Sequence, residues 1–168
     1  MVSSACLREC DFTMLQNNDA LSARQDWMRL LACAPLDVLE SWALAPAVVH
    51  TQASLVWLRN PQTGLVMVRG RVGGTGDRFN LGEMTVTRCA LRLPDGAHGV
   101  AYVQGRSHRK AELAALADAL LQTPGARSAV VQGLIAPLRA RADAEARTQR
   151  RKAQATRVEF FTLARGED

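Results

Sequence analysis

Between residues 48 and 105 the chain consists of short stretches rich in β-branched residues, separated by turn signals of only a few residues. Strands joined by such short turns run antiparallel, because parallel neighbours need a crossover connection of a dozen or more residues. The clearest turn signal is Asn-Pro-Gln-Thr-Gly over residues 60–64. This spacing predicts a four-stranded antiparallel β-meander, with strands over residues 48–58, 65–72, 84–93 and 99–105.

Helical spacing of apolar residues on both sides of this segment predicts the remaining elements. Residues 1–20 show no sustained period, so we expect a flexible N-terminal arm there and a single domain over residues 21–168. The order of elements indicates an α+β fold whose helices pack on one face of the sheet. Two helices are expected before the strands and two to three after them, over residues 22–34, 36–44, 107–123, 126–135 and 137–157.

The positive charge of the chain is concentrated in two zones. The formal net charge of +5 arises from 21 lysines and arginines against 16 aspartates and glutamates. Residues 59–110 hold nine cations and three acids (+6), and residues 139–157 hold seven cations and two acids (+5). A uniformly cationic surface for nucleic acid is therefore not indicated, and each zone needs its own explanation.

Several classes of protein lack their sequence signals here. No stretch approaches the roughly 18 consecutive apolar residues of a membrane-spanning helix, and the first 20 residues do not resemble a secretory signal. The four cysteines, Cys6, Cys10, Cys33 and Cys89, follow no zinc-ligand spacing. We therefore expect a reduced, cytoplasmic protein without a metal site.

The glycine-rich segment over residues 73–78 is a candidate phosphate-binding loop. Gly73, Gly74 and Gly76 would let backbone N–H groups approach an anion closely, and Arg78 adds positive charge. The segment is not a P-loop, because no Lys-Ser/Thr pair follows its last glycine, and a strand rather than a helix comes next. A hairpin loop that requires positive φ is the alternative interpretation.

Three further residues are candidates for contact with an anion or a partner. Strand alternation places Arg88 on the same face as Arg92, and a buried charge there would need an acid, a partner chain or an anionic ligand. An exposed face with arginine stems over apolar neighbours is the alternative. Arg106 and His108 lie where a strand ends and a helix begins, a place that attracts anions. No catalytic residue is identified.

The expected last helix, over residues 137–157, is basic and has only an alanine-rich apolar stripe. Arg147, Arg150 and Arg151 could bind nucleic-acid phosphates or lie on a helix that docks onto another protein. Phe160 and Phe161 follow, and this apolar area favours docking. We therefore predict that the helix and the two phenylalanines form a subunit interface, with a nucleic-acid-binding protein as the alternative.

Five strings together carry a resemblance to a known family. They are Arg-Gln-Asp-Trp-Met (24–28), Gly-Gly-Thr-Gly-Asp-Arg-Phe (73–79), Thr-Val-Thr-Arg (85–88), Leu-Ile-Ala-Pro-Leu (134–138) and Arg-Val-Glu-Phe-Phe-Thr (157–162). Each string is short, but five in this order are specific. The chain resembles PhnG, a subunit of the bacterial carbon–phosphorus lyase system, from about residue 24 to residue 166.

The resemblance implies a subunit of the carbon–phosphorus lyase core complex, which uses organophosphonates as a source of phosphorus. In that family the partners are PhnI, PhnH, PhnJ and the ATPase-like PhnL. The complex, an alpha-D-ribose 1-methylphosphonate 5-triphosphate synthase, displaces adenine from MgATP with a phosphonate. The resemblance implies that MgATP is a co-substrate of the complex, that the iron–sulfur cluster and S-adenosylmethionine (SAM) belong to PhnJ, and that this chain binds no cofactor. Activity is expected of the complex, and neither a membrane nor a nucleic acid is expected as a partner.

Overall fold

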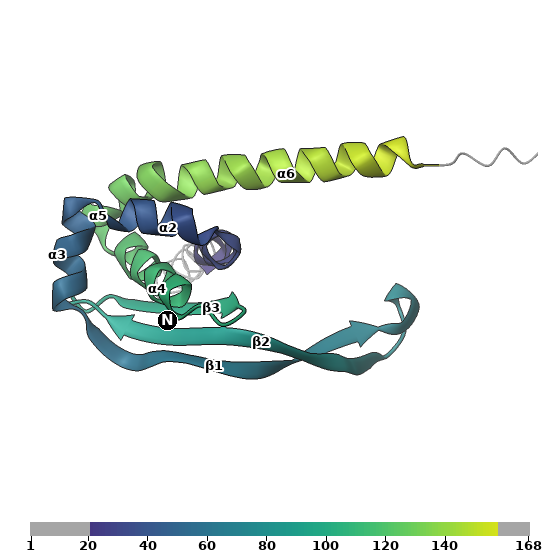
Figure 1. Cartoon of the computed structure of the whole chain (residues 1–168), viewed down its shortest axis with the longest axis horizontal. Helices are drawn as coiled ribbons and strands as arrows, with labels where there is room; N and C mark the ends of the chain where they lie inside the picture. The colour runs from purple at the N-terminus through teal and green to yellow at the C-terminus, as the bar shows by residue number, and fades with distance from the viewer. Residues whose placement is uncertain (1–20, 158–168) are drawn as a thin grey trace, which may run out of the picture.

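The computed structural model describes residues 21–157 of the chain, and within them the predicted α+β class is confirmed. Figure 1 shows an antiparallel sheet with the helices gathered on one side of it. The elements, in chain order, are a helix over residues 21–33, α2 (Leu36–Ala43), α3 (Pro46–Ser54), β1 (Val56–Arg71), β2 (Arg78–Arg92), β3 (His98–Gln104), α4 (His108–Gln122), α5 (Pro124–Val130) and α6 (Ala136–Ala155).

The sheet has three strands in the order β1-β2-β3, so the predicted four-stranded meander is wrong. The segment over residues 60–64 is not a turn but part of β1, which is 16 residues long. Register shifts between Trp57 and Arg59 and between Arg59 and Gln62 accommodate the extra residues of β1 as a bulge. Pro61 is tolerated because β1 is an edge strand, where a residue without an N–H group can face away from the ladder.

The prediction of two helices before the sheet is also wrong, because three precede it. Val48, expected in the first strand, lies in α3 and is buried in the core. Pro46 lies at the first turn of α3, where its missing N–H group costs nothing and its fixed φ favours a helix. Burial of Val48 against the core outweighs the weak strand preference of a single β-branched residue.

The elements after the sheet agree more closely with the prediction. Ser107 caps α4 as expected, since its Oγ accepts a hydrogen bond from the Lys110 backbone N–H at 3.2 Å. A π-helical turn, Val131–Ile135, connects α5 to α6, and the Ala136 N–H donates to the Val131 carbonyl. This wider turn relieves the clash that Pro137 would otherwise make with the carbonyl four residues earlier. The expected final helix begins at Ala136 and ends at Ala155.

The core surrounds α4, which packs against β2 and β3 on one side and against the other helices on the other. Leu91 of β2 and Leu113, Leu116 and Leu121 of α4 are almost completely buried. Gly99 allows the closest approach, because a Cβ atom there would lie 1.9 Å from the Ala115 carbonyl oxygen. The packing of helix on sheet therefore depends on the absence of a side chain at one position of β3.

Two parts of the molecule project beyond this body in the same direction (Figure 1). The first, named the hairpin arm here, consists of residues 64–85, because β3 pairs only with Val86–Arg92 of β2 and does not accompany the rest of the hairpin. The second is α6 beyond Ala142, where nearly every side chain is exposed. None of the described helices is long and apolar enough to cross a membrane.

Candidate functional site

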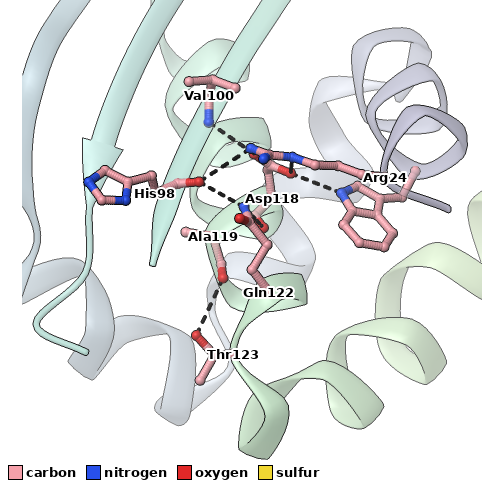
Figure 2. Close-up of polar contacts among 8 residues, drawn as sticks. Arg24, His98, Val100, Asp118, Ala119, Gln122 and Thr123 are labelled. Atoms are coloured by element: carbon pink, nitrogen blue, oxygen red, sulfur yellow. Dashed lines mark hydrogen bonds and ion pairs between the residues drawn. The ribbon is translucent and has the colours of Figure 1, made fainter. Parts of the chain in front are cut away.

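The most extensive polar network among the described residues surrounds Asp118 of α4 (Figure 2). Its side chain is fully buried and accepts hydrogen bonds from Arg24 at 2.7 and 3.2 Å, from the Trp27 indole at 2.9 Å and from the Val100 backbone N–H at 3.0 Å. The Arg24 guanidinium also forms an ion pair with it. A buried carboxylate with this many donors is fully satisfied, so the network is structural and leaves no oxygen for a substrate.

The same network covers part of the free edge of β3. The His98 carbonyl accepts from Arg24 at 3.4 Å and from the Gln122 amide at 2.7 Å, while the Val100 N–H is held by Asp118. These groups point away from β2 and would otherwise be open to pairing with another chain. The helix over residues 21–33, the edge strand and α4 are thereby joined at one place.

The sequence analysis missed this network, although signals for it were present. Asp118 is an isolated acid within the most apolar helical stretch of the chain, over residues 113–121, and such an acid needs a buried partner. Arg24 and Trp27 belong to a string already selected for its resemblance. What could not be read from the sequence is that these residues, 94 and 91 positions from Asp118, meet it in space.

A second polar chain connects the sheet to the start of α4. Thr87 is fully buried, and its hydroxyl donates to the Gly105 carbonyl at 2.7 Å. The Thr63 hydroxyl lies 3.2 Å from that of Thr87 and 3.1 Å from Nε2 of His108. The hydrogen bond with Thr63 thus holds His108, a predicted site residue, against β1. Its predicted contact with an anion stays a prediction.

The structure does not bring the predicted anion-binding residues together. Arg78 is paired with Arg71 at the far end of the hairpin arm, whereas Arg88 lies between Gln62 and Tyr102 in the middle of the sheet. Ten residues of strand separate the two arginines, which is roughly 33 Å. Arg106 is exposed in the loop between β3 and α4. These residues therefore cannot all contact one small ligand on a single chain.

The glycine-rich segment forms the loop of the hairpin, in agreement with the alternative interpretation. Gly73 has φ of 59°, which favours glycine, and Gly74 ends the same short 3₁₀ turn. A Cβ atom on Gly76 would lie 2.6 Å from the Val72 carbonyl oxygen, whose hydrogen bond with the Gly76 N–H closes the loop. Closure of the hairpin accounts for Gly73 and Gly76 without a ligand, so phosphate binding stays a prediction.

The residues predicted for a subunit interface are exposed where the structure describes them. Arg147, Arg150 and Arg151 lie on the projecting part of α6. Arg141 and Glu145 of α6 form an ion pair at 2.9 Å that is largely solvated, so it adds little stability. Phe160 and Phe161 lie outside the described residues.

Titratable groups that could act as nucleophiles or metal ligands are not assembled in the described part of the chain. Burial, with a smaller contribution from Glu112, raises the pKa of the Cys89 thiol to about 12, so this cysteine stays protonated at neutral pH. No group of three His, Cys, Asp or Glu residues between residues 21 and 157 is arranged to hold a metal ion.

Comparison with known proteins assigns the chain to a family. Residues 22–166 match the family model described as "Phosphonate metabolism protein PhnG". The chain belongs to the PhnG family. It is similar to the alpha-D-ribose 1-methylphosphonate 5-triphosphate synthase subunit PhnG of Rhizobium meliloti (strain 1021), with 43% identity over 158 residues that cover 94% of this chain and 99% of the relative.

Membership of the PhnG family confirms the resemblance seen in the sequence, and the structure now explains three of the strings that carried it. The string over residues 24–28 supplies Arg24 and Trp27 to the Asp118 network. The string over residues 73–79 closes the hairpin arm, and that over residues 85–88 includes the buried Thr87. In these three places at least one residue of each string serves the fold.

Proposed function

We propose that this chain is a subunit of an alpha-D-ribose 1-methylphosphonate 5-triphosphate synthase and that it acts there by binding other subunits. The name of the Rhizobium meliloti relative, which matches nearly from end to end, supports the first part. The projection of the hairpin arm and α6 away from the body supports the second. The chain is proposed to stabilise the assembly and to leave the chemistry to its partners.

The hairpin arm is the observation that carries this proposal. An isolated two-stranded hairpin is marginally stable in water, and this one also exposes large apolar side chains to solvent. Such side chains commonly mark a surface that another molecule covers. They are Leu65, Met67, Val72, Phe79 and Leu81, each of which is between 42% and 67% exposed.

The finer expectations form part of the same proposal. They are that the partners are PhnI, PhnH, PhnJ and PhnL, and that the complex displaces adenine from MgATP with a phosphonate. The iron–sulfur cluster and SAM would then belong to PhnJ. A cytoplasmic location fits the free thiols of Cys33 and Cys89.

Truncation and arm variants test the proposal in the co-expressed complex. Leu65→Ser with Leu81→Ser on the hairpin arm, and separately a chain ended after Ala142, should each reduce co-purification of the other subunits at least about tenfold. A chain ended after Arg157 keeps α6 but removes Phe160 and Phe161. Its comparison with the chain ended after Ala142 distinguishes the contribution of the two phenylalanines from that of the helix. Adenine release from MgATP and methylphosphonate should fall in parallel with assembly.

Two results would contradict the proposal. If the wild-type chain fails to co-purify with any other synthase subunit, it is not a member of the complex. If every variant assembles fully and adenine release nevertheless disappears, the chain contributes to the chemistry rather than to assembly.

A further inference from the structure

One face of the sheet is not covered by any helix that the structure describes (Figure 1). The opposite face packs under α4, where Thr87, Cys89 and Leu91 of β2 are buried. Because side chains alternate along a strand, Arg88 and Arg92 lie on the uncovered face. Strand pairing adds their neighbours in register. The same alternation places Val86 on this face, but Val86 is buried. The other positions on this face are Val56, Arg59, Gln62, Arg88, Ala90, Arg92, His98, Val100 and Tyr102, and we call them the open face.

The open face carries positive charge without any compensating acid. Arg59 lies opposite Ala90, so it is diagonal to both Arg88 and Arg92, and none of the nine positions is an aspartate or glutamate. The side chains of the three arginines form no hydrogen bond or ion pair with any residue between 21 and 157. Diagonal positions on paired strands are within reach of long side chains, so the charge of Arg59 acts on Arg88 and Arg92. An anionic partner would offset this repulsion.

We propose that the open face docks an acidic surface of another subunit of the synthase, with Arg59, Arg88 and Arg92 as the charged contacts and Tyr102 as the apolar anchor. This inference rests on the proposed function, because it requires the chain to assemble with other subunits. It adds a third contact surface, separate from the hairpin arm and from α6. It also accounts for Arg88 without the glycine-rich loop, which lies at the other end of β2.

The geometry favours an extended anionic surface over a small phosphorylated ligand. Arg88 and Arg92 are four residues apart on β2, so their Cα atoms are roughly 13 Å apart and the positive charge is spread along the strand. Small ligands are held in concave sites that bury most of their surface, whereas a sheet face is broad. Arginine and tyrosine are enriched at the energetic centres of protein interfaces, and Tyr102 is 54% exposed directly opposite Arg88.

The same residues fit a protein better than a single-stranded nucleic acid. Platforms for single strands stack successive bases on several aromatic side chains. Tyr102 is the one aromatic among the nine positions of the open face. Acidic residues of a neighbouring subunit can instead meet each arginine in a bidentate ion pair.

A double charge reversal, Arg88→Glu with Arg92→Glu, tests the inference in the co-expressed complex. We expect at least a tenfold loss of co-purifying subunits at 0.1 M NaCl, since each arginine would become a repulsive charge facing an acid. The matched control is Arg29→Glu with Arg139→Glu, the same change in net charge at exposed residues of the helical side, which should assemble like the wild type. The thermal transitions of both variants should stay close to that of the wild type, because all four side chains lie outside the core.

The outcomes separate this inference from the proposed function. If the wild type assembles and the Arg88/Arg92 variant assembles equally well, the open face is not a docking surface, and the proposed function stands. If that variant assembles normally but loses binding of a single-stranded oligonucleotide that the wild type retains, the partner is a nucleic acid and the inference is overturned. If the wild type itself does not assemble, the proposed function fails first.

Discussion

At the scale of single residues, Asp118 determines how the N-terminal helix is attached. Asp118→Ala would leave the Trp27 indole and the Val100 N–H without their acceptor and Arg24 without its counterion. Breaking a buried ion pair in this way costs about 3–5 kcal/mol, so we expect that loss in the free energy of unfolding. Urea denaturation measures it. Asp143→Ala, at an exposed position without an ion pair, should change stability by less than about 0.5 kcal/mol; equal effects would show that the network is dispensable.

Also at the scale of single residues, the buried Cys89 thiol predicts how the free energy of unfolding depends on pH. Burial raises its pKa from 9.0 to about 12, so an unfolded chain releases this proton from about pH 9 while the folded chain keeps it. The unfolded state then binds fewer protons, and the free energy of unfolding should fall as pH rises from about 9 to about 12. Urea denaturation across that range should show a shallower fall for Cys89→Ala, because the other titrating groups are common to both proteins. Identical pH slopes would contradict the assignment.

At the scale of elements, the contact between β3 and α4 depends on Gly99. A Cβ atom there would also lie 2.9 Å from the Ala119 methyl group, so Gly99→Ala must push the helix away from the strand. We expect a loss of about 3 kcal/mol or more, measured by thermal or urea denaturation. Gly82→Ala is the control, because nothing lies within 4 Å of its added methyl group. A tolerated Gly99→Ala would mean that α4 can shift without cost.

The helices and strands also show which local signals were sufficient to predict an element from the sequence. β3 and α4 were predicted almost to the residue, because Ser107 provides a cap and short turn signals delimit the strand. β1 was not predicted correctly, because the Asn60-Pro61 pair normally ends a strand and is tolerated here only at a sheet edge. Whether a strand lies at an edge is decided by its neighbours in the sheet.

At the scale of the whole molecule, the body and its projections behave as separate parts. Leu138 is buried and Ala142 is partly buried against the core, but most of α6 beyond them is exposed. The chain ended after Ala142, used above to test assembly, should therefore keep the thermal transition of the full chain. If the truncated chain has no thermal transition, its failure to assemble would reflect unfolding. Only the Leu65/Leu81 variant would then test the role of the surface in assembly.

The sequence by itself determined the α+β class, the concentration of charge in two zones and the family, because alternation, capping and ordered short strings are local properties of the chain. Only the tertiary structure decided that Arg78 and Arg88 lie far apart, that Asp118 holds Arg24, and that Arg59 joins Arg88 and Arg92 on one open face. Strand register and sheet edges arise from pairing between distant segments. The positive charge in the middle of the sequence is therefore divided in space among the hairpin arm, the open face and the start of α4.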